Sequence, residues 1–366
     1  MGIVRDKTPL ELIHIKHYSK FMRTIDWNDE DNSVMLIDQT KLPKEYIVLE
    51  CKDVGALAEA ITSLKVRGAP ALGVAGGFGI ALAAHTSHAQ GPRDLMQDLE
   101  GAAQILRGTR PTAVNLFWGI DRVLSKANAG HSIAQIKELA LEEAKKMADE
   151  DVQKCRDIGK HGEALLEDGD IVLTHCNAGR MGCVDWGTAL GVVRSAIEKG
   201  KRIKVIACET RPLNQGSRIT TWELLQDNIP VTLITDSMIG HVMKSGDIDN
   251  VIVGADRIVE DAVFNKIGTY TLSIVAKKHG VPFYVAAPSS TFDFDRRAAD
   301  IKIEERDPSE LKYFGGEQIA PLEVKAYNPA FDATPMENVS AIITEYGILY
   351  PPFVFEEIRE RWAGLK

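Results

Sequence analysis

The second half of the chain alternates between short apolar strings and helical stretches. After about Gly169, each string rich in β-branched residues is followed by a segment with apolar positions at helical spacing. Strands that are apolar on both faces and separated by helices are typical of a parallel sheet covered on both sides. The pattern predicts an α/β fold, with a Rossmann-like doubly wound parallel sheet in a domain over residues 146–366. The predicted strands are DIVLTHC (170–176), KVIACET (204–210), VTLITD (231–236), NVIVGAD (250–256), PFYVAAP (282–288) and VSAIITE (339–345).

Residues 1–145 follow another pattern and predict a smaller, mainly helical N-terminal domain that begins with short strands. SVMLIDQTKLP (33–43) is typical of a strand followed by a turn. Helices are predicted over 54–66, 70–85 and 110–127, the last with Pro111 at its first helical position, and a long polar-faced helix or helix pair over 131–166 bridges to the second domain.

Charge and composition exclude several classes of function. The chain has 366 residues and a net charge of -9, with no dense run of Lys or Arg, which argues against binding nucleic acid or an anionic membrane. Five cysteines without a CxxC pair fit a reducing compartment. The N-terminus carries charges where a signal peptide is apolar, and the apolar stretch 68–84 is Gly-rich and marginal in length for a membrane span. We expect a cytoplasmic protein.

Chemically useful side chains follow several of the predicted strands. In an open parallel sheet, ligands bind beyond the carboxyl ends of the strands. Cys176, the segment 209–211, Asp236 and Asp256 all stand at such ends. A single Asp there often caps the next helix, but several groups delivered to one edge favour catalysis.

Cys176 has two interpretations. It closes its strand and precedes the small residues NAG, where helix N-terminal amides would favour a reactive thiolate. Free cysteines are more often small buried hydrophobes, as we expect for Cys208. Cys183 is a possible partner of Cys176 in a disulfide or metal site, but no second pair of ligands accompanies them, so we expect no metal.

Candidate phosphate donors stand at predicted helix starts. Arg67 precedes Gly68 at one helix start, Arg110 stands at another, and Asn265 with Lys266 opens a third. The alternative for the two arginines is pairing with surface carboxylates. The glycines of GVAGGFG (73–79) follow no strand, so they indicate close helix packing rather than dinucleotide binding.

Taken together, the motifs resemble a known family. From about Asp38 to the C-terminus the chain is similar to methylthioribose-1-phosphate isomerases, within a group that includes archaeal ribose-1,5-bisphosphate isomerases and regulatory subunits of a eukaryotic translation-initiation exchange factor. The motifs occur in the family's order. They are RGAPALG (67–73), RPTAVNL (110–116), THCNAG (174–179), ETRPLNQGSRITTWEL (209–224), VGADRI (253–258) and NKIGTY (265–270).

The resemblance implies an aldose–ketose isomerase of methionine salvage that converts 5-methylthioribose 1-phosphate to 5-methylthioribulose 1-phosphate. It implies Cys176 and Asp256 as the catalytic pair, in a homodimer without metal or organic cofactor. The implied substrate contacts are Arg67, Gly68, Ala69, Arg110, Gln215, Asn265 and Lys266.

Two mechanisms are compatible with this pair. The anomeric phosphate locks the sugar as a ring, so an acid must assist cleavage of the ring C–O bond; Asp256 can do so if apolar surroundings raise its pKa. Cys176 thiolate then moves the C2 proton to C1 through an enol phosphate. A hydride shift from C2 to C1 is the rival route.

One segment departs from the family pattern. Where small residues usually follow THCNAG, this chain has RMGCVDWGTALG, with Arg180, Cys183, Asp185 and Trp186. One interpretation is a solvent-facing ion pair between Arg180 and Asp185. The other makes both specificity residues of a changed 5-position pocket, for 5-deoxyribose 1-phosphate or ribose 1,5-bisphosphate.

Two further functions are less compatible with the sequence. A non-catalytic sugar-phosphate sensor would not need both Cys176 and Asp256. An NAD-dependent oxidoreductase would need a glycine fingerprint after the first strand of the sheet, which THCNAGRMG lacks.

Overall fold

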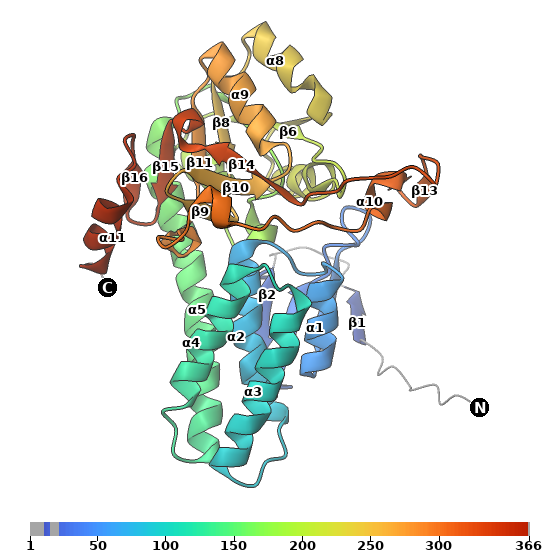
Figure 1. Cartoon of the computed structure of the whole chain (residues 1–366), viewed down its shortest axis with the longest axis vertical. Coiled ribbons are helices and arrows are strands. Elements are labelled where there is room, and N and C mark those ends of the chain that lie inside the picture. The colour runs from blue at the N-terminus through green and yellow to red at the C-terminus, as the bar shows by residue number, and fades with distance from the viewer. Residues whose placement is uncertain (1–10, 15–21, 365–366) are drawn as a thin grey trace. The chain divides into compact units, whose positions relative to one another are not determined.

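The computed structural model describes residues 11–14 and 22–364 (Figure 1). Contacts within the chain define two compact units, Met1–Glu150 and Asp151–Lys366. The boundary between them lies within helix α5 (Ile133–Gly162), as does the one expected between residues 145 and 146.

The first unit combines a small antiparallel sheet with a larger set of helices, so the prediction of a mainly helical N-terminal part is confirmed (Figure 1). The sheet has the order β1-β4-β3-β2. Its strands are β1 (Glu11–His14), β2 (Ile25–Asn28), β3 (Ser33–Ile37) and β4 (Ile47–Cys51). The helices are α1 (Val54–Thr62), α2 (Ala69–Thr86), α3 (Pro92–Thr109), α4 (Val114–Ala127) and the first half of α5.

Helix α2 is the core helix of this unit. It is the one helix among the described residues with the length and hydropathy of a membrane span, and 78% of that window is buried inside the protein. Its glycines let α4 approach closely: a Cβ on Gly119 of α4 would lie 1.9 Å from the carbonyl oxygen of Gly73 of α2. The prediction that the GVAGGFG glycines serve helix packing is therefore confirmed.

The predicted start of α4 at Pro111 is wrong. Pro111 lies in a turn that the N–H of Ala113 closes on the carbonyl oxygen of Arg110 at 3.0 Å, and the helix begins at Val114. Proline suits the second position of such a turn as well as the first turn of a helix, so the sequence alone did not separate the two.

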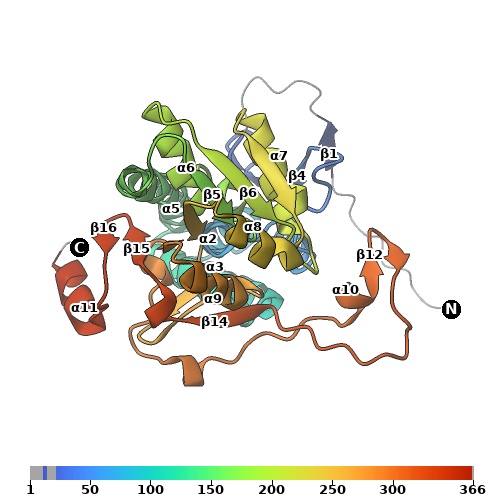
Figure 2. The ribbon, with the colours of Figure 1, turned by 90° about the horizontal axis from the view of Figure 1, so that it is seen from above.

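The second unit contains a seven-stranded sheet of order β16-β15-β11-β8-β5-β6-β7 (Figures 1 and 2). Every neighbouring pair is parallel except β15 with β16, which confirms the predicted doubly wound sheet. The strands are β5 (Ile171–Thr174), β6 (Lys204–Cys208), β7 (Val231–Ile234), β8 (Asn250–Val253), β11 (Phe283–Ala286), β15 (Ala341–Thr344) and β16 (Gly347–Leu349).

Helices cover both faces of this sheet (Figure 2). Val251 and Val253 point into a core shared with α8 (Ile239–Ser245), α9 (Thr269–His279) and α11 (Phe355–Ala363). Ile252, between those two valines, points into the other core, which α5, α6 (Ala189–Glu198) and α7 (Thr221–Gln226) supply. Alternate side chains of one strand thus serve opposite cores, which is why the strands are apolar throughout.

The strand order reverses between β5 and β8. From β5 the chain adds β6 and then β7 on one side; it then returns to β8, beside β5, and adds β11 and β15 on the other. Loops that leave two adjacent strands in opposite directions open a crevice at their carboxyl ends, where α/β proteins bind ligands.

A smaller antiparallel sheet was not predicted. It consists of β9 (Arg257–Val259), β10 (Ala262–Lys266) and β14 (Phe331–Pro335). Asn265 and Lys266 lie at the end of β10, opposite Asp332 and Phe331, rather than at a helix start as predicted. The strand that pairs with them is distant in sequence, so no local pattern could reveal it. Along the chain, the segment between β10 and β14 contains a short helix, α10 (Ser309–Lys312), and a hairpin of β12 (Tyr313–Phe314) with β13 (Glu317–Gln318).

Candidate active site

Cys176 lies just beyond β5 and has φ +63°, a backbone conformation that residues other than glycine rarely adopt. Its N–H donates to the hydroxyl of Thr210 at 2.8 Å, and its carbonyl oxygen accepts from the hydroxyl of Thr220 at 2.7 Å. Thr210 has φ +66°. Two strained residues in direct contact are typical of a functional site, because such strain persists only where the surroundings hold it.

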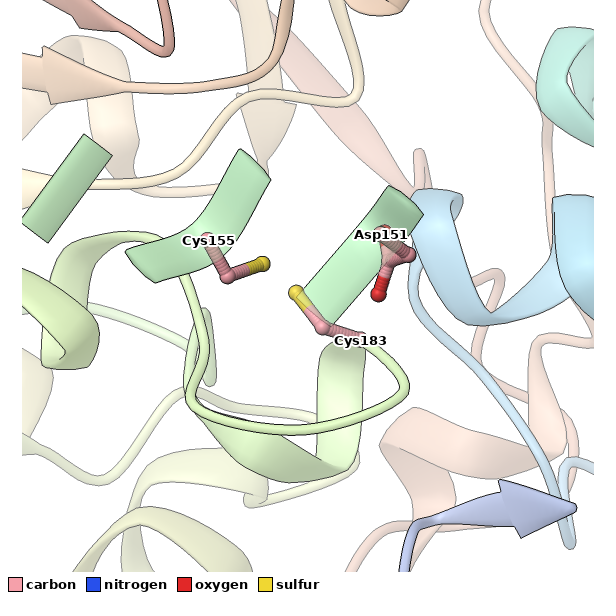
Figure 3. Close-up of side chains that lie close together, drawn as sticks. All are labelled: Asp151, Cys155 and Cys183. Carbon is pink, nitrogen blue, oxygen red and sulfur yellow. The ribbon is translucent and has the colours of Figure 1, made fainter. Parts of the chain in front are cut away.

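Cys176 is the partly exposed cysteine of this protein; the other four are buried, and all five, each within the described residues, are free thiols. Burial raises the pKa of Cys208 well above its usual range, which fits the prediction that it is a small core residue. Cys183, considered as a partner for Cys176, lies against Cys155 instead (Figure 3).

The turn after β6 is held by Asp236. Its carboxylate accepts the N–H of Thr210 at 2.9 Å and that of Arg211 at 2.8 Å. The Nδ1 atom of His175 lies 3.8 Å from the same carboxylate. Burial lowers the pKa of His175 although Asp236 opposes the shift, so the ring is neutral. Its Nε2 atom lies 2.8 Å from the carbonyl oxygen of Ile267, which assigns the ring hydrogen to Nε2. Asp236 therefore positions this edge of the site.

Asp256 follows β8, the strand beside β5, and its N–H donates to the carbonyl oxygen of Phe264 at 2.9 Å. The loops that leave β5 and β8 are in close contact, because a Cβ on Gly254 would lie 2.6 Å from the Cβ of Ala178. Cys176 and Asp256 thus come from the two strands that flank the switch point of the sheet, as an active site of this architecture requires.

Gln215 is 4% exposed and follows the turn after β6. The next residue, Gly216, packs on the end of β6: a Cβ there would lie 1.7 Å from the carbonyl oxygen of Cys208. The Oε1 atom of Gln215 is buried and accepts no hydrogen bond from the described part of the chain. A buried acceptor without a donor is costly, so it is typical of a site that a ligand hydroxyl completes.

The end of β10 lies beside His175. A Cβ on Gly268 would lie 3.1 Å from the imidazole ring, and the charge of Lys266 contributes to the low pKa of that ring. The Nζ atom of Lys266 donates to the carbonyl oxygen of Ala330 at 3.0 Å, and Asn265 donates to the hydroxyl of Thr269 at 3.2 Å. These two predicted contact residues therefore flank the strand end that carries Cys176.

Asp332 binds the first turn of α9. Its carboxylate accepts the N–H of Gly268 at 2.7 Å and that of Tyr270 at 3.0 Å. Burial nevertheless raises its pKa to about 6, because desolvation of the carboxylate outweighs the two amide donors and the nearby Lys266.

A buried ion-pair network below Cys176 was not predicted. Glu223 is 1% exposed and accepts hydrogen bonds from the side chain of Asn177, from the N–H of Arg180 at 2.9 Å and from Arg194 at 2.8 Å. Arg194, itself 3% exposed, also pairs with Asp227 at 2.5 Å. A charged residue on an amphipathic helix gives no sign of burial in the sequence, although Glu223 belongs to one of the quoted motifs.

The segment that departs from the family pattern, residues 180–191, is largely folded into the protein. Arg180 pairs with Asp185 at 2.8 Å, as one interpretation expected, but its side chain is only 12% exposed and it also lies 3.6 Å from Asp227. Trp186 is buried and its Nε1 donates to the hydroxyl of Ser195 at 3.3 Å. The solvent-facing part of that interpretation is wrong for Arg180, which lies against Glu223 and Asp227, whereas the Asp185 side chain is 35% exposed.

The first unit holds the remaining predicted contact residues at one end of two helices. Gly68 has φ +94° and precedes α2, which begins at Ala69 and has no side-chain cap within the described residues. α2 and α4 run in parallel: a Cβ on Gly73 would lie 3.1 Å from the carbonyl oxygen of Asn115, near both helix starts, and a Cβ on Gly77 would lie 3.2 Å from the side chain of Val123, further along both helices. Two helix N-termini at one end favour an anion.

The two arginines stand at this same end. Arg67 directly precedes Gly68, and its Nε donates to the buried side chain of Gln39 at 3.1 Å. Arg110 occupies the turn that leads into α4. The grouping suits a phosphate better than any one of these features alone.

Comparison with known proteins agrees with this architecture. Residues 65–351 match the Initiation factor 2 subunit family. A methylthioribose-1-phosphate isomerase of Acetivibrio thermocellus is 51% identical over 322 residues, which cover 87% of this chain and 94% of the relative.

Two solved structures share the fold over almost the whole chain. The 5-methylthioribose 1-phosphate isomerase of Pyrococcus horikoshii OT3 is 43% identical with a TM-score of 0.87, covering 94% of this chain and 96% of its own. A protein of A. fulgidus described as the delta subunit of translation initiation factor eIF-2B is 62% identical with a TM-score of 0.83, covering 91% and 97%. By sequence match and by fold, the chain belongs to the Initiation factor 2 subunit family.

Proposed function

We propose that this chain is an aldose–ketose isomerase that converts 5-methylthioribose 1-phosphate to 5-methylthioribulose 1-phosphate, a step of methionine salvage. The observation that carries the proposal is the origin of Cys176 and Asp256 at the carboxyl ends of β5 and β8, on either side of the switch point. The isomerases among its relatives support the choice of reaction.

Each member of the pair has a defined task. Asp256 protonates the ring oxygen, so that the ring C–O bond breaks and the open chain forms. Cys176, as thiolate, removes the C2 proton to give an enol phosphate and returns a proton at C1. The proton of the 2-hydroxyl passes to Asp256, which restores both groups. Incorporation of solvent deuterium at C1 supports this route over the hydride shift.

The other groups bind the substrate. The buried oxygen of Gln215 accepts a sugar hydroxyl, and Asn265 and Lys266 complete this side of the site. Arg67, Gly68, Ala69 and Arg110 bind the phosphate. Arg110→Ala is expected to raise KM by about 10-fold or more, the loss of one charged hydrogen bond, whereas Arg93→Ala, an exposed arginine of the same unit, leaves KM unchanged.

The charge of Arg180 is already balanced by Asp185 and Asp227, which favours a methylthio substituent over a second phosphate. The role of Arg180 and Asp185 as specificity residues remains a prediction. It is tested by comparing Arg180→Ala with the unaltered protein on 5-methylthioribose 1-phosphate, 5-deoxyribose 1-phosphate and ribose 1,5-bisphosphate. An unchanged order of preference among the three sugars excludes that role.

The same three-sugar assay tests the function itself. We expect turnover of the methylthio sugar, lost in Cys176→Ser and Asp256→Asn but retained in Cys51→Ala, which alters a buried thiol of the first unit. Preference for another of the sugars would replace the substrate and keep the reaction class. No turnover of any of them, together with binding, would instead favour a regulatory sensor.

We further propose a cytoplasmic homodimer that needs no cofactor for turnover and binds neither nucleic acid nor membrane. The net charge of -9 supports the last point. Light scattering after gel filtration gives the oligomeric state, and turnover in the presence of a chelator tests the need for a metal.

A further inference from the structure

Three potential metal ligands meet outside the candidate active site (Figure 3). Asp151 and Cys155 lie four residues apart on α5 and therefore point from the same face of the helix. Cys183 comes from the segment that departs from the family pattern, directly after the short helix η2 (Arg180–Gly182). Their ligand atoms all lie within 4.8 Å of one another, and the two sulfur-bearing side chains point toward each other.

These separations suit one small cation. In a tetrahedral zinc site, bonds of about 2.3 Å to sulfur and about 2.0 Å to oxygen put neighbouring ligand atoms roughly 3.5 Å apart. Two thiolates and a carboxylate match the preference of Zn²⁺ and related thiophilic ions, and a water molecule completes the fourth position.

Backbone amides support the ligands in their anionic forms. The N–H of Val184 donates to Oδ2 of Asp151 at 2.7 Å, which orients the carboxylate beside the two sulfur atoms. The backbone of Gly187 lies near Cys155 and favours its thiolate. Hydrogen bonds of this kind to the ligands are usual around metal centres.

The two cysteines are buried. Cys155 is 1% exposed and Cys183 is 2% exposed, and both pack against Trp186. The guanidinium of Arg156 lies 3.3 Å from the centre of the Trp186 ring and adds a positive charge beside the cluster. In the absence of a cation, the neighbouring Cys183 thiol and burial raise the pKa of Cys155 well above its usual range.

We propose that Asp151, Cys155 and Cys183 form a structural site for a thiophilic divalent cation of the Zn²⁺ class. Binding converts two thiols to thiolates and releases two protons for each ion bound. The site joins α5 to the segment between Cys176 and α6, so the cation stabilises the loop that follows Cys176 without taking part in the reaction. A disulfide between Cys155 and Cys183 would need an added oxidant.

Cobalt substitution tests the proposal on the full chain. Reduced, metal-free protein is titrated with Co²⁺ and then with Zn²⁺. We expect one ion per chain, sulfur-to-cobalt charge-transfer absorption with the visible bands of tetrahedral cobalt, two protons released, and a higher melting temperature with zinc. Cys155→Ser and Cys183→Ser each weaken the charge-transfer absorption, and the variant with both substitutions loses it. Asp151→Asn keeps it and binds about 10- to 100-fold more weakly.

Two variants are matched controls. Cys51→Ala removes another buried thiol, and Asp149→Asn removes an exposed carboxylate of the same helix; both are expected to bind cobalt as the unaltered protein does. The proposal is overturned if the unaltered protein shows no charge-transfer absorption, if the absorption survives loss of both cysteines, or if reduced protein forms a Cys155–Cys183 disulfide in air and takes up no metal. The titration of the unaltered protein decides the matter even if a cysteine variant fails to fold.

Discussion

Glu223→Gln is the perturbation that most directly tests how the fold positions Cys176. A carboxylate at this place accepts from three donors, namely the side chains of Asn177 and Arg194 and the N–H of Arg180. Glutamine has one acceptor oxygen, so if that oxygen keeps Arg180 and Arg194, its amide group faces the amide of Asn177, donor against donor.

Rotating the Asn177 amide does not repair the conflict. Its Nδ2 also donates to the hydroxyl of Thr220 at 3.0 Å, and that hydroxyl already donates its own hydrogen to the carbonyl oxygen of Cys176 at 2.7 Å. A rotated Asn177 would present an acceptor to an oxygen that has no hydrogen left. The disturbance therefore passes directly to the residue that carries the thiol.

The expected loss in the free energy of unfolding is about 3 kcal/mol. Breaking a buried ion pair costs about 3–5 kcal/mol, and the lower end applies because Arg194 keeps Asp227. A displacement of the Cys176 loop by a fraction of an ångström is expected to lower kcat about 10- to 100-fold.

Urea unfolding followed by circular dichroism, together with steady-state turnover of 5-methylthioribose 1-phosphate, measures both effects. Glu260→Gln is the control, because Glu260 pairs with Arg297 on the surface, where both partners stay hydrated and the change is small. If Glu223→Gln is no more destabilising than this control and keeps full kcat, the network does not position Cys176.

Three other substitutions give independent checks. Thr210→Val removes the acceptor of the Cys176 N–H and is expected to lower kcat about 10- to 100-fold. Thr210→Ser keeps the acceptor and is expected to keep kcat; equal kcat values of the two variants would show that this hydrogen bond does not position Cys176. The pKa of Asp332 is raised to about 6 in the folded state, so the free energy of unfolding falls as the pH rises from about 4 to 6, by up to about 1.4 kcal/mol per pH unit. Urea titrations of Asp332→Asn at several pH values should show most of that slope removed. Gly119→Ala forces α2 and α4 apart at a cost of about 3 kcal/mol, whereas Gly101→Ala, with open space around it, is expected to gain about 0.5–1 kcal/mol; thermal unfolding of both variants tests the sign.

Much of the fold was predictable because the burial of each strand and helix leaves a regular pattern of apolar residues in the local sequence. Each strand of the large sheet is buried on both faces, so its apolar string stands out from the helices around it. The residues just past those strands, Cys176 and Asp256 among them, then follow from the rule that ligands bind at carboxyl ends. The helix starts were less predictable, as Pro111 shows, because proline suits a turn and a first helical turn alike.

The contact partners of these residues could not be predicted in the same way. Asn265 and Lys266 were expected at a helix start and lie in a strand, because β14 pairs with them from a distant part of the chain. Glu223 and Arg194 look like ordinary surface charges of amphipathic helices until α6 and α7 bury them against each other. The same holds for Cys155 and Cys183, which nothing in their spacing connects.

The sequence by itself therefore determined the large sheet, its helices and the two strand ends at which Cys176 and Asp256 stand, since local burial leaves a periodic record in residue type. The tertiary structure alone decided which side chains meet, which charges are buried and where the backbone of Cys176 is held at positive φ. Those features depend on the packing of segments far apart in the chain, and local periodicity carries no information about such partners.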